Sequence, residues 1–244
     1  MKKMKVLVTL LLVISSLLCS CGFLKDDTLV SAWDELHNSN FSYVETRTFQ
    51  DENDKTASLV IKGECTAEPY IFTQEIVEGD AIWSECYIYQ EDDAYKGVVM
   101  IDGVWQEAKV GQEDPIFDGY EERNDIKILA KEEKSLDGIS YVIYKTEYKT
   151  MVGEEYELED NIEAIVSQEY YINKDTGKIE RINTDTSDLN RANNIAISMY
   201  SSGDTLEEAT EKANEHASET KVEVEITYID ENYVLEIPEV KNLN

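Results

Sequence analysis

Residues 58–110, SLVIKGECTAEPYIFTQEIVEGDAIWSECYIYQEDDAYKGVVMIDGVWQEAKV, contain the pattern that decides the fold. Apolar and polar residues alternate along five short segments, which is the period of a half-buried β-strand. The predicted strands are residues 58–66, 70–77, 81–90, 95–101 and 104–110. Asp102-Gly103 between the last two is a strong hairpin signal, because Asp-Gly tolerates the positive φ of a primed turn. Even spacing with short turns favours an antiparallel meander over βαβ units.

The same alternation continues on both sides of this stretch. Further strands are predicted at residues 41–49, 126–131, 139–149, 164–173, 178–183 and 222–228, with a last strand at 233–238 that Pro238 ends. A short helix is expected after Asp114-Pro115, and residues 151–163 are expected to form a loop or a poorly packed helix. Residues 187–203 carry no assignable pattern.

Two longer helices are predicted. Residues 28–38 place Leu29, Trp33 and Leu36 on one helical stripe, behind Asp27 or Thr28 as the N-cap. Residues 205–217 begin with a capping box and carry a thin apolar stripe, which is typical of a surface helix. The sequence therefore predicts an α+β fold, a long curved antiparallel sheet with a few helices.

Segment 81–90 is apolar on both faces, so both faces need cover. A curved sheet explains this pattern if aromatic side chains line its concave face and contact an apolar ligand there. Our candidates for such lining residues are Trp83, Tyr87, Tyr89 and Trp105. The alternative is that these aromatics belong to the ordinary core.

The first 22 residues, MKKMKVLVTLLLVISSLLCSCG, resemble a bacterial lipoprotein signal. A basic start precedes an apolar run of about 13 residues, short of the roughly 20 that span a bilayer. Leu18-Cys19-Ser20-Cys21 matches the lipobox, which makes Cys21 the expected lipidated N-terminus. An uncleaved membrane anchor and lipidation at Cys19 fit the pattern less well. We expect a signal peptide at 1–20, a tether at 21–27 and a single domain at 28–244, held at the extracytoplasmic face of the cell membrane.

The chain is strongly acidic. Its net charge is −30, and cleavage before Cys21 removes three lysines and leaves 19 basic against 52 acidic residues, or −33. Nucleic acid is excluded as a partner, because binding it requires Lys and Arg to neutralise phosphates. A basic protein partner fits this charge, and the alternative is that the charge keeps a tethered protein soluble. We expect a monomer.

Cleavage and lipidation leave Cys65 and Cys86 from the four cysteines. The meander places them two strands and three residues apart, beyond the roughly 7 Å between Cα atoms that a disulfide can bridge. Free cysteines are favoured, and a disulfide is the alternative. His37 and His216 are the two histidines, and no spacing joins them into a metal site. We find no catalytic motif, so we expect no cofactor and no enzymatic activity.

A family resemblance rests on four motifs. The chain carries NFSYVETRTF at 40–49, DGISYVIYKT at 137–146, QEYYINKDTGKIERI at 168–182 and YVLEIPE at 233–239, behind a lipobox and a short helix. This order resembles the LolA-like superfamily, and within it the lipoproteins of the LppX and LprG type. Residues 188–219 depart from the layout as an insertion.

The resemblance implies a half-barrel whose helices cover the concave side of the sheet, and a cavity that holds lipid or acyl chains. Our leading hypothesis is a non-enzymatic membrane-anchored lipoprotein that binds an apolar or amphipathic ligand in that cavity. The second hypothesis is an acidic protein-interaction or envelope-sensing module without a small-molecule ligand.

Overall fold

The computed structural model describes residues 26–50, 56–78, 81–91, 94–108, 126–153, 156, 158, 161–215 and 219–240, except the side chains of Glu78, Ala81 and Trp83. The predicted signal peptide, Cys21 and the tether up to residue 25 lie outside these residues, as does the short helix expected after Asp114. Those assignments stay predictions.

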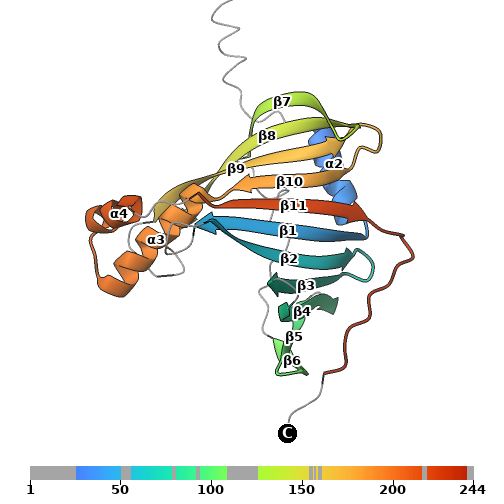
Figure 1. The fold of residues 1–244 in the computed structure, drawn as a ribbon, viewed down its shortest axis with the longest axis horizontal. Helices are drawn as coiled ribbons and strands as arrows, with labels where there is room; N and C mark the ends of the chain where they lie inside the picture. Colours follow the sequence, from blue (N-terminus) through green and yellow to red (C-terminus); the bar gives the residue numbers. More distant parts are fainter. Residues whose placement is uncertain are drawn as a thin grey trace, which may run out of the picture.

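Eleven antiparallel strands form one curved, unclosed sheet (Figure 1). Its spatial order is β6-β5-β4-β3-β2-β1-β11-β10-β9-β8-β7, so β11 joins two meanders by pairing with β1. The strands are β1 Phe41–Gln50, β2 Thr56–Thr66, β3 Ile71–Glu78, β4 Ala81–Glu91, β5 Ala94–Ile101, β6 Val104–Ala108, β7 Lys127–Leu136, β8 Ile139–Val152, β9 Ile162–Asn173, β10 Ile179–Asp185 and β11 Lys221–Tyr228. The predicted α+β half-barrel is confirmed.

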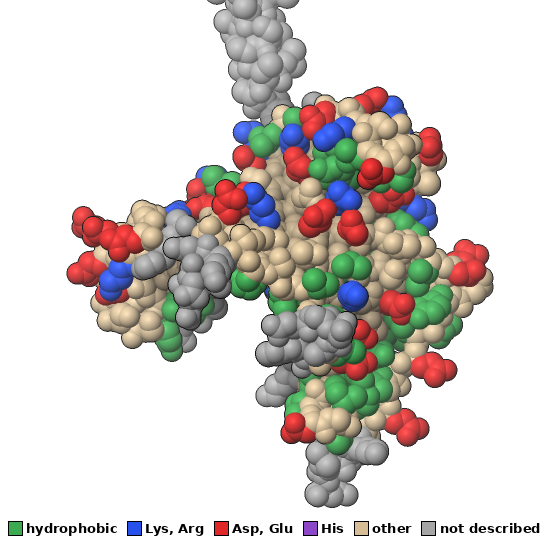
Figure 2. All heavy atoms as spheres, viewed as in Figure 1, with side chains coloured by type: hydrophobic (Ala, Val, Ile, Leu, Met, Phe, Trp, Pro, Cys, Tyr) green, Lys and Arg blue, Asp and Glu red, His purple; other side chains and the backbone are tan. Residues whose placement is uncertain are grey.

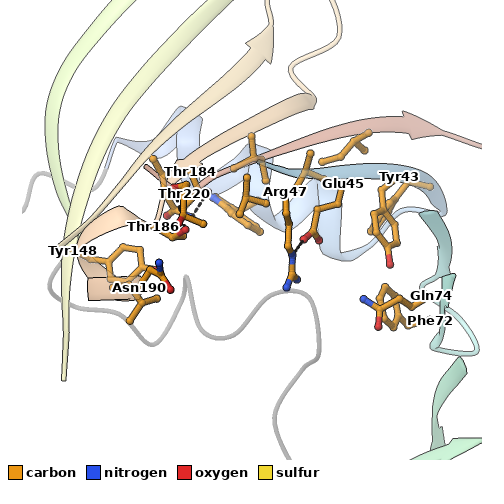
Figure 3. A pocket seen from close by; sticks show the side chains of 18 of the residues that line it. Tyr43, Glu45, Arg47, Phe72, Gln74, Tyr148, Thr184, Thr186, Asn190 and Thr220 are labelled. Carbon is orange, nitrogen blue, oxygen red and sulfur yellow. Dashed lines mark hydrogen bonds and ion pairs between the residues drawn. The ribbon is translucent and has the colours of Figure 1, made fainter. Parts of the chain in front are cut away.

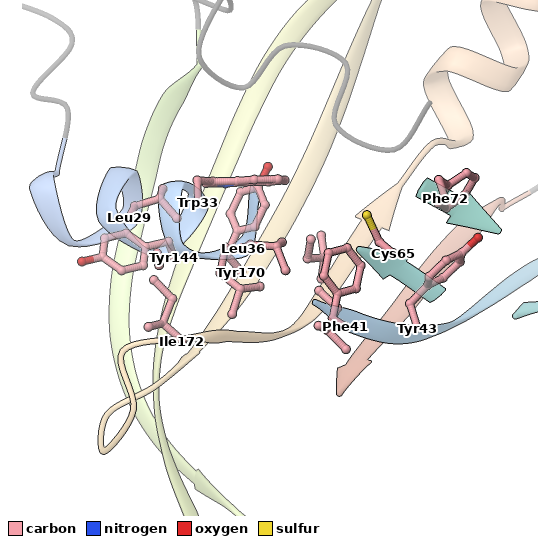
Figure 4. Packing of buried hydrophobic residues seen from close by; sticks show 14 of the residues in the cluster. Leu29, Trp33, Leu36, Phe41, Tyr43, Cys65, Phe72, Tyr144, Tyr170 and Ile172 are labelled. Atoms are coloured by element: carbon pink, nitrogen blue, oxygen red, sulfur yellow. The ribbon is translucent and has the colours of Figure 1, made fainter. Parts of the chain in front are cut away.

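Helix α2, Asp27–His37, covers one face of this sheet, which we call the inner face. Asp26 is the N-cap, one residue earlier than predicted, and its carboxylate accepts a hydrogen bond from the Thr28 amide at 3.0 Å. Leu29 and Leu36 are fully buried on the helical stripe (Figure 4). Burial of each contributes about 2 kcal/mol. Trp33 meets the Tyr170 ring edge-on, with ring centroids 5.5 Å apart, so α2 is anchored over β9.

Helices α3, Ser187–Ser202, and α4, Leu206–Glu215, form a hairpin beside one end of the sheet (Figure 1). Ala192, Ile195 and Ala196 of α3 are buried in one cluster with residues at the far ends of β8 and β9, and α4 adds two alanines to that cluster. Gly203, with φ of 69°, ends α3 in the left-handed conformation that glycine adopts readily. The capping box predicted for α4 is confirmed, since Thr205 and Glu208 exchange hydrogen bonds.

The predicted strand at 233–238 is wrong, because this segment is extended but pairs with no strand of the sheet. Strands β1 and β11 already have neighbours on both sides, so no free edge is available beside them. Side-chain contacts hold the segment instead. The buried Asn40 donates through Nδ2 to the carbonyls of Asp230, Glu231 and Tyr233, at 3.1 to 3.2 Å.

Two further expectations concern the hairpin after β8 and the cysteines. Strand β8 runs to Val152 and β9 begins at Ile162, so strand covers only the two ends of the segment 151–163, which was predicted to form a loop or a poorly packed helix. Cys65 and Cys86 are thiols that form no disulfide with each other. Cys65 faces Phe72 and Phe72 faces Ile88, which places Cys86 two strands and two residues from Cys65.

Candidate ligand-binding pocket

A pocket of about 550 Å³ opens on the inner face, where residues of α2 and α3 meet the sheet (Figure 3). Its volume lies within the roughly 300–1,000 Å³ of pockets that hold one small ligand. The lining residues are Trp33 of α2; Phe41, Tyr43, Glu45 and Arg47 of β1; Phe72 and Gln74 of β3; Tyr148 of β8; Gln168 of β9; Ile182 and Thr184 of β10; Val222, Val224 and Ile226 of β11; Leu189, Asn190 and Asn193 of α3; and Thr186 and Thr220 beside them.

Every second side chain of a strand points to the inner face, and these side chains form the floor of the pocket. Most of them are apolar. Tyr43 of β1 stands opposite Ile226 of β11, and the two neighbouring inner positions of β11 are Val224 and Val222. Tyr43 stacks on Phe72 of β3 with ring centroids 5.6 Å apart. These residues give the pocket a continuous apolar surface across three strands.

The end of the pocket near α3 is polar. Figure 3 shows Thr184, Thr186, Thr220 and Asn190 gathered on the side away from Tyr43 and Phe72. The Thr186 hydroxyl donates to the Thr220 carbonyl at 3.2 Å. The Thr220 hydroxyl is buried and has no hydrogen-bond partner among the described residues. The pocket therefore offers hydroxyl and amide groups at one end and hydrocarbon at the other.

Glu45 and Arg47 are the charged side chains among the described residues that line the pocket. They lie two residues apart on β1, so both point to the inner face. The Arg47 guanidinium donates through Nε to the Glu45 carboxylate. The side chain of Glu45 is 15 % exposed and that of Arg47 is 48 % exposed, which puts the carboxylate on the wall and the guanidinium near the opening.

The Tyr43 hydroxyl also forms a hydrogen bond where the backbone pairing of β2 with β3 is interrupted. Strands β2 and β3 pair as Lys62 with Glu75 and as Cys65 with Phe72, and between these pairs the Tyr43 hydroxyl donates to the Thr73 carbonyl at 3.1 Å. Gly63 makes room for the ring, because a Cβ there would lie 1.9 Å from the Thr73 oxygen. Burial raises the pKa of the Tyr43 hydroxyl, which keeps it neutral and able to donate.

A second hollow, of about 350 Å³, lies on the opposite or outer face, beyond Gly63. Tyr87 and the carboxylates of Glu64, Glu75 and Glu85 line it, with Leu235 of the C-terminal segment. Burial and the facing Glu75 raise the pKa of Glu85, and burial with these carboxylates raises the pKa of Tyr87.

Three of the four aromatic residues predicted to contact a ligand, Tyr87, Tyr89 and Trp105, stand apart from the inner pocket. Tyr87 lines the outer hollow and packs edge-on against Trp105, with ring centroids 5.2 Å apart. Tyr89 faces Ile71 and so has the same outward orientation as Tyr87. The side chain of Trp83 lies outside the described part of the structure. A ligand contact by these four residues stays a prediction.

Sequence reasoning missed the residues that line the inner pocket. Phe41, Tyr43, Glu45 and Arg47 alternate along β1, and this spacing was a usable signal for one shared face. Leu189 and its neighbours on α3 had no such signal, because no helix was predicted there.

Within the described ranges, no group of three or more His, Cys, Asp or Glu side chains is arranged to hold a metal ion. Among the same residues, no helix combines the length and apolarity needed to cross a membrane.

Comparison with known proteins gives structural matches at low identity. No protein-family model matches the sequence, and no curated protein matches it. The structure is similar to lipoprotein LppX from Mycobacterium tuberculosis, at 10 % identity and a TM-score of 0.46 over 86 % of this chain and 96 % of that one. A DUF1329 family protein from Desulfovibrio piger matches at 12 % identity and a TM-score of 0.34, over 83 % and 90 %. A LolA superfamily protein from Nitrosomonas europaea matches at 8 % identity and a TM-score of 0.36, over 84 % and 93 %.

Proposed function

We propose that this protein is a non-enzymatic lipoprotein that binds the apolar part of a lipid-like ligand in the inner-face pocket. The observation that carries the proposal is the pocket itself, about 550 Å³ with an apolar floor and a polar end. An amphipathic ligand satisfies both parts of such a lining, because its hydrocarbon covers the floor and its headgroup meets the hydroxyls and amides.

The location of the protein is part of the proposal. The lipobox supports cleavage before Cys21 and its lipidation, and two acyl chains suffice for stable anchoring where one does not. The six residues from 22 to 27 reach at most about 20 Å when extended, so α2 begins close to the bilayer. We propose the extracytoplasmic face of the cell membrane, where a lipid-derived ligand is close at hand.

Quenching of Trp33 tests ligand binding. Trp33 lines the pocket, whereas Trp105 lies on the outer side of the sheet beside Tyr87. An amphiphile with a dibrominated acyl chain is titrated into the full chain, stripped of lipid and detergent, and tryptophan emission is recorded. We expect saturable quenching in the wild type and its loss in Trp33→Phe, with Trp105→Phe as the matched control that keeps it.

Two outcomes contradict the proposal. The first is the absence of saturable quenching in a folded wild-type protein. The second is quenching that survives Trp33→Phe and disappears in Trp105→Phe, which places the ligand on the outer face. Melting curves of each variant confirm that the fold is retained.

The second candidate function is an acidic interaction module, favoured by the net charge of −30. Figure 2 shows acidic side chains spread over several elements of the viewed face, including α4. Attraction between exposed charges is largely screened beyond about 8 Å at roughly 0.15 M salt. A basic protein partner held by this charge dissociates as salt rises, and binding of such a partner without amphiphile binding supports this function instead.

A further inference from the structure

The charges of the inner pocket cancel locally. Glu45 and Arg47 form an ion pair within the pocket, and the other described lining residues are apolar or carry uncharged hydroxyls and amides. A charged headgroup that enters this pocket loses hydration without meeting an unbalanced opposite charge. Binding a full charge there is therefore costly.

The whole molecule adds a second bias. With a net charge of −30, its field repels anions at long range. Arg47 is the one lining cation among the described residues, and Glu45 already accepts a hydrogen bond from it. An anionic headgroup has to compete with Glu45 for the same guanidinium.

We infer that the Glu45–Arg47 ion pair makes the pocket selective for an amphiphile with an uncharged, hydroxyl-bearing headgroup of the monoacylglycerol kind. The inference rests on the proposed function, since it names the class of ligand for the same pocket. The polar end of the pocket supports it, because Thr184, Thr186 and Asn190 line that end with uncharged hydroxyl and amide groups. A ligand hydroxyl can satisfy such a group, since hydroxyls both donate and accept.

Three probes whose hydrocarbon chains have the same length test this selectivity. A monoacylglycerol, a fatty acid and an alkylamine displace a fluorescent apolar probe from the full chain in about 0.15 M salt, where long-range charge effects are screened. We expect the monoacylglycerol to bind most tightly, by about tenfold over the fatty acid, the ratio that one charge-assisted hydrogen bond typically supplies.

Single substitutions reverse the preference if the ion pair sets it. Glu45→Gln leaves the Arg47 guanidinium uncompensated, and we expect fatty acid affinity to rise about tenfold relative to monoacylglycerol. Arg47→Gln leaves the Glu45 carboxylate uncompensated, and we expect the same relative gain for the alkylamine. Glu223→Gln and Arg181→Gln are matched controls, because these two residues form an ion pair with 3.3 Å between Nη1 and Oε1 and do not line the pocket.

The outcomes separate this inference from the proposed function. If none of the three probes binds the folded wild type, the proposed function fails and the inference fails with it. If the probes bind but the fatty acid equals the monoacylglycerol, or Glu45→Gln shifts the ratio no more than Glu223→Gln, the pocket binds lipid and the inference alone is overturned. Melting temperatures of all variants identify any loss of folding.

Discussion

Replacing Gly63 by alanine removes the space that the Tyr43 ring occupies between β2 and β3. The added Cβ would lie 1.9 Å from the Thr73 carbonyl oxygen, and 2.6 and 2.7 Å from Cε1 and the hydroxyl oxygen of Tyr43. A backbone carbonyl cannot swing away as the end of a flexible side chain can. The Tyr43 ring and part of the β2–β3 ladder must therefore move.

The size of the effect follows from two contributions. Overpacking of a well-packed site typically costs about 1–3 kcal/mol. Displacing the Tyr43 hydroxyl also leaves the Thr73 carbonyl without its 3.1 Å hydrogen bond, and a buried group left unsatisfied costs about 1–3 kcal/mol. We expect Gly63→Ala to lower the free energy of unfolding by about 2–6 kcal/mol, a large share of the roughly 5–15 kcal/mol typical of a domain.

Urea unfolding followed by tryptophan fluorescence measures this loss. Tyr43→Phe removes only the hydroxyl, which leaves the Thr73 carbonyl unsatisfied without overpacking, and should cost about 1–3 kcal/mol. Ser58→Ala is the control, because Ser58 is exposed on the same strand, and it should stay within about 0.5 kcal/mol of the wild type. A Gly63→Ala variant as stable as the Ser58→Ala control would refute the reasoning that Gly63 is required for the Tyr43 contact.

Three further predictions concern the helices and the overall charge. Burial alone would raise the pKa of Asp26, but hydrogen bonds from Lys131, Tyr144 and Thr28 outweigh it and lower the pKa to about 2. A lowered pKa stabilises the fold above the unfolded value near 4 and loses this effect as pH falls toward 2. Asp26→Asn should therefore cost about 1 kcal/mol at pH 7, after allowance for solvent screening, and the difference in urea midpoints should shrink as pH falls below about 4 and vanish only below about 2. Thr205→Ala should cost about 1 kcal/mol and speed amide exchange in α4, since it removes the N-cap; unchanged exchange would contradict this. Raising NaCl from about 10 mM to about 0.15 M should raise the melting temperature, because screening weakens the repulsion between like charges in a chain of net charge −30. A lower melting temperature at about 0.15 M would show that attraction between opposite charges dominates.

Alternation and capping made most of the sheet and two helices predictable. In strands such as β11, the alternation of Val222, Val224 and Ile226 with polar residues predicts which face of the strand is buried. Helix α3 could not be read in this way, because its buried stripe consists mainly of Ala192 and Ala196, residues that carry little hydrophobic signal.

The candidate site was less predictable than the fold, for two physical reasons. Which face of β4 points inward depends on register across several strands, and a register shift between Ile76 and Val77 interrupts the β3–β4 pairing. A one-residue change of register moves a side chain to the other face. In addition, the pocket brings Trp33 of α2 together with Asn190 of α3, and no local pattern links residues so distant in the sequence.

The calorimetric binding stoichiometry of a monoacylglycerol tests most directly the claim that one ligand occupies the inner pocket. The measurement compares the wild type with Val224→Trp, which places a bulky indole on the pocket floor, and with Thr227→Trp, at an exposed position of the same strand outside the pocket. We predict one molecule per chain for the wild type and Thr227→Trp, and no binding to folded Val224→Trp. Equal binding by all three proteins would contradict the claim.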